Sequence, residues 1–393
     1  MSTSKFIPLR MPRFPFMPIA GERYADVVSQ WQLAQSLQDP EQPLYLGVDV
    51  PSLLAVEQNA PAVLEALAAA VQAGGVVPVL GVAAYPDDTL TTEALVQSQL
   101  FLHKRLSVTA KLAFLMPDAA VNPALPQLLR LAGVHRALIC LPEEAASDGL
   151  PGAFLWASPD GSKVLSAVMQ RKRLAFLPDD AINALEGDPA FYDVPVLSGA
   201  LPVVPEDPRG SGYFSEMTTT ASALFMSRRQ SAAAYYLCGQ PDRSAPFADA
   251  VRALCFLQVP TADSVPTDDA ALSAACAYAA AVADRERAES VSYAAATPER
   301  PVFKDVFTLT GKGVLLKAFK LCEDGSGDLV LRLVQSVDRE CRASVLFDPA
   351  DAAFWLDMQP YEIKTLRIGK DGRALEVNFL ENIVPQRTES FPE

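Results

Sequence analysis

Residues 111–133, KLAFLMPDAAVNPALPQLLRLAG, decide the fold class of this chain. The stretch opens with an apolar run that predicts a buried strand, breaks at Met116-Pro117, presents an acid at Asp118, and starts a helix after a proline-containing turn. In α/β enzymes, catalytic groups lie at the carboxyl ends of parallel strands. Asp118 is therefore either a nucleophile or the remnant of one.

The alternation of strand and helix extends on both sides of this stretch. Apolar runs predict further strands at 44–50, 76–85 and 136–141. Between them, one helix opens at Asn59 and Pro61 and ends at Gly74-Gly75, and a second, through residues 93–106, is expected to be capped by Thr91 or Thr92. The apolar face of the first helix consists of Val63, Leu64, Leu67 and Val71. Such alternation requires crossover connections, so we expect a parallel sheet.

The rest of the chain predicts three parts. Later strands at 162–169 and 193–199 are separated by only a short segment, so residues 1–205 are expected to form an incomplete (β/α) barrel. Alanine-rich segments with a helical period predict a three-helix bundle over residues 206–297. Short strands joined by Gly, Asp and Pro turns predict a β-sandwich-like domain over residues 298–393. The expected fold class is therefore α/β plus all-α plus all-β.

Composition excludes several functions. The net charge of −14 leaves no basic face to neutralise phosphates, so we expect no binding of nucleic acid or of anionic membranes. No apolar run approaches the length of a membrane span, and four prolines interrupt the first 21 residues, unlike a signal-peptide core. The six cysteines are far apart and mostly within apolar runs, which is typical of buried free thiols. We expect a cytoplasmic protein.

Several motifs in order resemble one enzyme family. Residues 74–106 (GGVVPVLGVAAYPDDTLTTEALVQSQLFLHKRL) and 114–134 (FLMPDAAVNPALPQLLRLAGV) resemble the catalytic domain of glycoside hydrolase family 38, the α-mannosidases. Residues 154–169 (FLWASPDGSKVLSAVM) resemble its substrate-side hairpin, and residues 208–216 (PRGSGYFSE) the start of its helix bundle. LKAFKLCEDGSGDLVLRLVQ and MQPYEIKTLRI resemble its C-terminal β region. The resemblance implies that Asp118 occupies the nucleophile position.

The metal site that the family implies is not matched by this sequence. Family members hold zinc with a His-x-Asp pair, the nucleophile and a histidine of the bundle, but Pro12, Phe14 and Pro260 stand at the three other positions. Asp118 alone cannot form a zinc site, which needs about three or four ligands. The two histidines, His103 and His135, are predicted on a helix surface and a strand edge. We therefore expect no metal and no other cofactor.

Two pairs of acids are candidates for the second carboxylate that a glycosidase needs. Retaining glycosidases need two carboxyl groups about 5 to 5.5 Å apart. Asp87 and Asp88 match the family's acidic turn after a strand, on the same rim as Asp118, and can equally be turn residues. Asp179 and Asp180 lie in the shortened segment and are more typical of a helix N-cap.

Two functions follow from these residues. The first is a catalytically degenerate α-mannosidase-like protein, a pseudoenzyme with a carbohydrate-binding or interaction role, in which Asp118 is vestigial. The second is an active, metal-independent glycoside hydrolase in which Asp118 works with Asp87, Asp88 or Asp180. The partners we expect are a carbohydrate ligand and, because the acidic surface and helical bundle permit it, an oligomer or protein partner.

Overall fold

The structure is a computed structural model of the 393-residue chain. It describes residues 5–9, 31–32, 35, 43–82, 88–115, 122–141, 151–170, 175–176, 195–198, 210–256, 268–297, 306–347 and 352–382. The chain divides into two compact units: the first comprises residues 1–219 and 251–278, and the second comprises residues 220–250 and 279–393. Among the described residues, no helix combines the length and apolarity needed to cross a bilayer.

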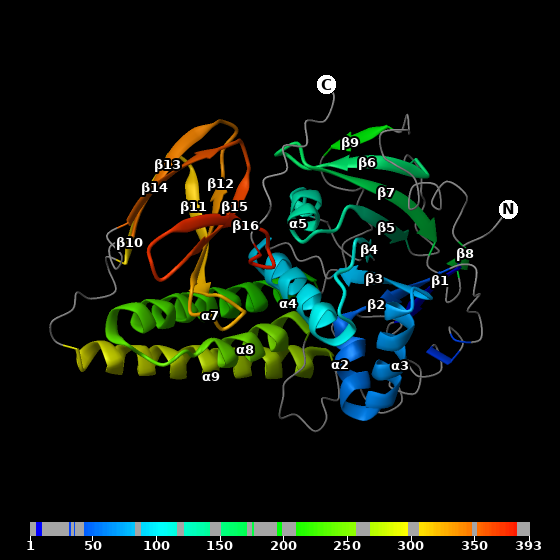
Figure 1. The fold of residues 1–393 in the computed structure, drawn as a ribbon, viewed down its shortest axis with the longest axis horizontal. Helices are drawn as coiled ribbons and strands as arrows, with labels where there is room; N and C mark the ends of the chain where they lie inside the picture. Colours follow the sequence, from blue (N-terminus) through cyan, green and yellow to red (C-terminus); the bar gives the residue numbers. More distant parts are fainter. Residues whose placement is uncertain are drawn as a thin grey trace. The chain divides into compact units, whose positions relative to one another are not determined.

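A nine-stranded sheet forms the centre of the first unit (Figure 1). Its order is β8 (Ala175–Phe176), β1 (Lys5–Leu9), β2 (Leu44–Val48), β3 (Val76–Val82), β4 (Leu112–Leu115), β5 (Arg136–Leu141), β7 (Lys163–Gln170), β6 (Ala153–Ala157) and β9 (Val196–Ser198). Six neighbouring pairs are parallel, and only β1–β8 and β6–β7 are antiparallel. The predicted parallel sheet is confirmed, whereas its closure toward a barrel stays a prediction.

Helices form the crossovers between the successive parallel strands β2, β3, β4 and β5. They are α2 (Val50–Asn59), α3 (Pro61–Gln72), α4 (Asp88–Leu106) and α5 (Leu125–Leu131). The helix α3 begins at Pro61, as the sequence predicts, its buried residues are Leu64, Leu67 and Val71, and Gly74 follows it with a φ of 76°. That left-handed conformation favours glycine, so the turn after α3 depends on this residue. Asn59, which was expected to open this helix, is instead the last residue of α2, and Val63 is only partly buried.

Two further details of the helices differ from the sequence-based expectation. Residues 44–50 were expected to be one strand, but the strand ends at Val48 and α2 begins at Val50, with Asp49 as its N-cap. The helix α4 begins at Asp88, so Thr91 and Thr92 are buried within it and do not cap it. The first difference arises because a carboxylate that accepts a helical N–H, followed by Pro51 in the first turn, starts a helix more strongly than an apolar run extends a strand.

Three long helices follow in the chain, as the sequence predicts. They are α7 (Gly210–Cys238), α8 (Ser244–Phe256) and α9 (Asp268–Ala295), and each contributes residues to both units. In the second unit, the Ser227 hydroxyl donates to the Ala283 carbonyl at 2.7 Å, and Arg243, just before α8, holds Glu286 of α9 through two hydrogen bonds. The domain boundaries expected at residues 205 and 297 stay predictions.

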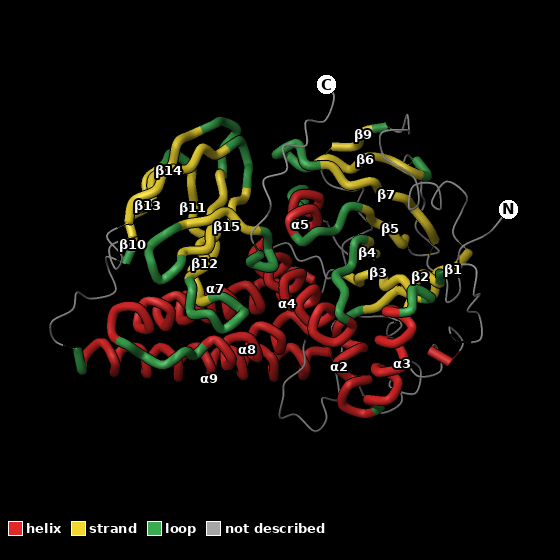
Figure 2. The backbone as a smooth tube through the Cα atoms, in the orientation of Figure 1, coloured by secondary structure: helices red, strands yellow, loops and turns green. Residues whose placement is uncertain are grey.

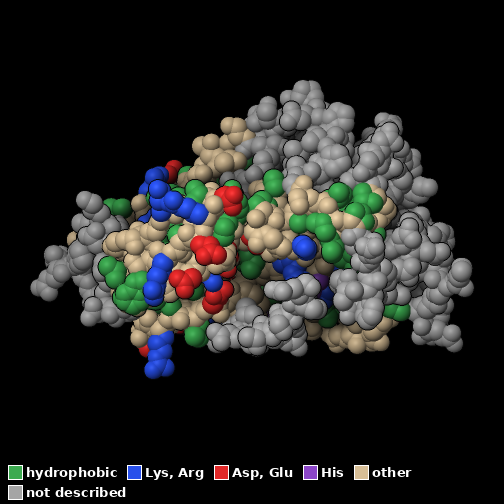
Figure 3. All heavy atoms as spheres, turned by 90° about the horizontal axis from the view of Figure 1, so that it is seen from above, with side chains coloured by type: hydrophobic (Ala, Val, Ile, Leu, Met, Phe, Trp, Pro, Cys, Tyr) green, Lys and Arg blue, Asp and Glu red, His purple; other side chains and the backbone are tan. Residues whose placement is uncertain are grey.

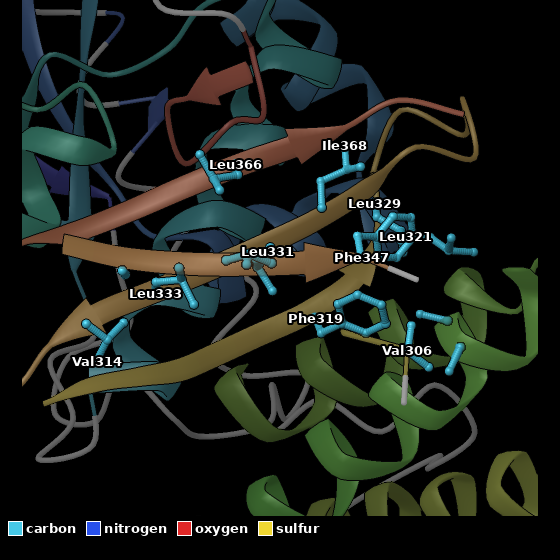
Figure 4. Close-up of a cluster of buried hydrophobic side chains, with 14 of the residues drawn as sticks. Val306, Val314, Phe319, Leu321, Leu329, Leu331, Leu333, Phe347, Leu366 and Ile368 are labelled. Carbon is cyan, nitrogen blue, oxygen red and sulfur yellow. The ribbon is translucent and has the colours of Figure 1, made fainter. Parts of the chain in front are cut away.

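The C-terminal part is all β and consists of two antiparallel sheets (Figure 2). One is β10 (Phe307–Thr310), β13 (Cys341–Phe347) and β14 (Ala352–Met358), and the other is β11 (Val314–Leu321), β12 (Leu329–Gln335), β15 (Ile363–Ile368) and β16 (Ala374–Val377). Phe319 and Leu331 of one sheet and Phe347 of the other meet in a common core (Figure 4). Leu237 of α7 belongs to the same core. One face of each sheet packs into this core, which agrees with the expected sandwich-like domain, and every residue of β12 is buried.

All six cysteines are free thiols, as their spacing predicts. Cys140, Cys255, Cys276 and Cys322 are buried, and Cys238 and Cys341 are partly buried. Burial raises the pKa of the Cys255 thiol, so this group packs as a small apolar side chain.

Candidate functional site

The candidate acids of the first unit follow adjacent parallel strands. The strands β3 and β4 end at Val82 and Leu115, which are partners in the register, so the segments with Asp87, Asp88 and Asp118 leave neighbouring strands at the same edge of the sheet. Asp118 and Asp87 lie outside the described residues, and Asp88 is the first residue of α4. Their roles and the distance between their carboxyl groups stay predictions.

A further acid, Asp49, lies at this edge and was not singled out in the sequence. It follows β2 directly, where the next position of the neighbouring strand is Gly81, and Gly81 pairs in turn with Phe114 of β4. A Cβ atom added to Gly81 would lie 2.9 Å from Phe114 Cζ and 3.0 Å from Asp49 Cβ. The side chains of Asp49 and Phe114 therefore both lie close to Gly81, and they leave no room there for a larger residue.

Asp49 is linked to the first turn of α2. Its Oδ1 accepts a hydrogen bond from the Ser52 backbone N–H at 2.8 Å. The Ser52 side chain is fully buried, and its hydroxyl has no hydrogen-bond partner among the described residues. Asp49 is 7% exposed, so its carboxylate is largely buried at the carboxyl end of β2, the end at which α/β proteins bind ligands. The sequence signal for this site was an acid between an apolar strand and Pro51.

The histidines lie where the sequence predicts. His103 is exposed in the last turn of α4, and His135 is exposed just before β5, with its Nδ1 2.5 Å from Arg130 Nη1. In the described part of the chain, no three His, Cys, Asp or Glu side chains gather as metal ligands would. Pro12, Phe14, Asp179, Asp180 and Pro260 lie outside the described residues.

The second unit contains a buried ionic cluster that sequence reasoning missed. Lys320 Nζ lies 2.5 Å from Glu323 Oε1 and 2.8 Å from Glu381 Oε1, and Arg228 Nη2 lies 2.5 Å from Glu323 Oε1. The Glu323 backbone N–H also donates to Glu381 Oε2 at 2.6 Å. No pattern along the chain indicates this cluster, because its members come from α7, β11, the following turn and a segment after β16.

Electrostatics keeps Glu323 and the nearby Asp324 ionised. Burial alone would raise the pKa of Glu323, but the charges of Lys320 and Arg228 and the hydrogen bonds they donate hold it well below its ordinary value. In the same turn, burial opposes ionisation of Asp324, yet hydrogen bonds from Ser326 and the charge of Arg367 lower its pKa to about 2. Arg367 also binds Asp328 at 2.7 Å, so one guanidinium joins both ends of the turn between β11 and β12.

These shifts predict the acid sensitivity of the second unit. An acid whose pKa is lowered by folding contributes stability above its unfolded pKa, and this is lost as the pH falls through its folded pKa. We therefore expect the free energy of unfolding, measured by urea titration, to decline steadily as the pH falls from about 5 to about 2.

Two variants test this prediction. Glu323→Gln should be less stable at neutral pH, and its free energy of unfolding should decline less steeply with falling pH. Glu340→Gln, which changes an exposed acid outside the cluster, should decline like the wild type. If the free energy of unfolding of Glu323→Gln declined with pH as steeply as that of the wild type, the prediction would be wrong.

The face shown in Figure 3 carries acidic and basic side chains next to one another in the described part of the chain. Several cationic side chains form ion pairs within the second unit. Arg228, Lys320 and Arg367 each pair with a carboxylate of that unit.

Comparison with solved structures identifies the fold. An α-mannosidase from Enterococcus faecalis V583 aligns with 84% of this chain and 46% of its own length, at 14% identity and a TM-score of 0.55. A glycosyl hydrolase family 38 protein from Enterococcus faecalis aligns with 98% of this chain and 55% of its own length, at 12% identity and a TM-score of 0.49. No protein-family model and no curated protein sequence matches the chain.

The chain thus has a fold similar to that of an α-mannosidase, and it spans about half the length of these two structures. This agrees with the fold that the sequence resemblance to glycoside hydrolase family 38 implies. At such low identity the comparison concerns the fold alone, because one fold supports many functions.

Proposed function

We propose that this chain is a catalytically degenerate, cytoplasmic α-mannosidase-like protein that binds a carbohydrate at the carboxyl edge of its parallel sheet. The observation that carries the proposal is the combination of an α-mannosidase-like fold with acids after three adjacent strands, β2, β3 and β4. Carboxylates at such an edge accept hydrogen bonds from hydroxyl groups, and these are the groups a sugar presents in number. Asp49 is the acid of this set whose surroundings the structure describes.

The proposed loss of catalysis rests on the chemistry of the residues present. Zinc needs about three or four nitrogen, oxygen or sulfur ligands, and the positions of the family's other ligands hold Pro12, Phe14 and Pro260. Both histidines are exposed and lie away from the strand ends that carry the acids. The residues of this chain therefore do not fit the family's zinc site. Without a metal to orient the sugar, Asp118 would face a glycosidic bond as an unassisted carboxylate.

Activity and binding measurements test the proposal together. We expect no release of nitrophenol from p-nitrophenyl α-mannoside above background, with or without added zinc or cobalt, and no difference between the wild type and Asp118→Asn. A positioned acid contributes about 10² to 10⁴-fold to the rate, so its loss together with the metal brings the reaction close to background. Titration calorimetry with mannose and mannobiose should nevertheless show binding, and Asp118→Asn should weaken it.

The control for binding is Asp338→Asn, which changes an exposed acid in the turn between β12 and β13 of the second unit and should leave the affinity unchanged. A wild-type rate above background that disappears in Asp118→Asn would instead establish the alternative, a metal-independent glycoside hydrolase. Absence of both activity and binding would refute a carbohydrate ligand of this class.

A further inference from the structure

The two β-sheets of the second unit have four edge strands, and three of them are protected against pairing with another chain. The strands β10 and β16 have only four residues each. The strand β11 is longer, but its register shifts between Leu316 and Ala318, which indicates a β-bulge at Lys317. Short edge strands, bulges and edge lysines are the devices by which proteins prevent strand addition.

The fourth edge strand, β14, has none of these devices. It runs for seven residues, AAFWLDM, and pairs with β13 in an uninterrupted register from Ala352 to Met358. It contains no proline, glycine or lysine. In the described part of the chain, β13 is its only strand partner, so the other edge presents backbone N–H and C=O groups for a further strand.

Apolar side chains accompany this open edge. Trp355, at the centre of β14, is 60% exposed, more than any other large apolar side chain in the described part of the chain, and Leu346 on β13 is 43% exposed on the same face. On the opposite face, Phe354 and Leu356 pack against the core but are only partly buried. The side chains of an added strand would pack beside these apolar groups on both faces, and exposed apolar surface of this kind commonly marks an interaction site.

We propose that β14 pairs with β14 of a second copy of this chain to form an antiparallel, isologous dimer. A twofold axis at Trp355 pairs all seven residues, because Ala352 then lies opposite Met358 of the partner and Trp355 opposite Trp355. The register places Asp357, the only charged residue of the strand, opposite Ala353, so no like charges meet. The result is one six-stranded sheet with an aromatic pair at its centre.

We infer a second copy of this chain as the partner because β14 is complementary to itself. In the register that pairs the whole strand, its large aromatic residue is at the centre. Its single charged residue then faces a small residue. The dimer concerns the second unit alone, so it goes beyond the carbohydrate-binding proposal and does not depend on it. One ladder of seven residues buries less than a standard interface of about 1,600 Å², so we expect a dissociation constant in the micromolar range.

Light scattering and analytical ultracentrifugation of the full chain test the dimer. From about 1 to about 300 μM, the mass should rise from 42.2 kDa toward twice that value. Trp355→Lys should raise the dissociation constant at least about tenfold, because it places two lysines face to face. The matched control is Leu375→Lys on the edge strand β16, which replaces another exposed apolar side chain and should leave association unchanged. Thermal unfolding should confirm that both variants are folded.

Cysteine substitution tests the register separately. Trp355→Cys should form a covalent dimer on mild oxidation with copper phenanthroline, because directly opposite residues have Cβ atoms about 4.5 to 5.5 Å apart. Leu375→Cys and the wild type, whose own six thiols are buried or partly buried, should not. A chain that stays monomeric up to about 300 μM, a dimer unaffected by Trp355→Lys, or equal cross-linking of both cysteine variants would each overturn the proposal.

Discussion

Replacing Lys320 by methionine should lower the free energy of unfolding by about 3–5 kcal/mol, because it leaves buried carboxylates without their cation. Lys320 is 1% exposed and lies between Glu323 and Glu381. Glu323 keeps Arg228 after the substitution, but Glu381, which is 3% exposed, loses the one ion pair that joins it to a cationic side chain among the described residues. The loss is a large share of the roughly 5–15 kcal/mol that stabilises a typical domain.

A second substitution separates this electrostatic cost from a loss of packing. Lys320→Met combined with Glu381→Gln should recover much of the stability, because glutamine can still accept the hydrogen bond from the Glu323 N–H without carrying a charge. Lys364→Met is the matched control. Lys364 also pairs with two carboxylates, but Glu362 is partly exposed and Glu376 is exposed, so the loss of Lys364 should cost less than about 1 kcal/mol. Urea unfolding measures all four proteins, and equal costs for the two single lysine substitutions would contradict the argument.

The sequence predicted the elements with strong periodicity and missed those defined by a few residues. The crossover helix α3 was predicted because its apolar residues recur at helical spacing and Gly74-Gly75 ends it. The helix α2 was missed because its first residues, Val50 and Pro51, continue the apolar run of β2, and only the cap of Asp49 separates them. A cap is a single hydrogen bond, and periodicity cannot reveal it.

The candidate site was predicted in part for a similar reason. The position of an acid after an apolar strand can be read along the chain, and Asp87, Asp88 and Asp118 were selected in this way. Asp49 also follows an apolar strand, but it was not selected because the strand was expected to continue through it to residue 50. The ionic cluster could not be predicted at all, because Arg228 and Glu381 are far apart in sequence and meet only through the packing of α7 against the β domain within the second unit.

Replacing Gly81 by alanine should lower the free energy of unfolding by about 1–3 kcal/mol, because the new methyl group overpacks the carboxyl end of the sheet. Its Cβ would lie 2.9 Å from Phe114 Cζ and 3.0 Å from Asp49 Cβ, closer than nonbonded carbons normally approach. Phe114 is almost fully buried and Asp49 is held by the Ser52 N–H, so neither can move without breaking other contacts.

A substitution of Phe114, the side chain nearest to the added methyl group, provides the control for this prediction. Phe114→Leu removes the ring atoms that the methyl group would meet, at the cost of a cavity of its own. In a double-mutant cycle, the loss of unfolding free energy in the double variant should therefore be smaller than the sum of the losses in the two single variants. We expect a difference of about 0.5–3 kcal/mol. Strictly additive costs would show that Gly81 is needed for another reason. Because Asp49 forms the other side of this contact, Gly81→Ala should also weaken mannose binding in the same calorimetric titration, whereas the Lys320→Met change in the second unit should not.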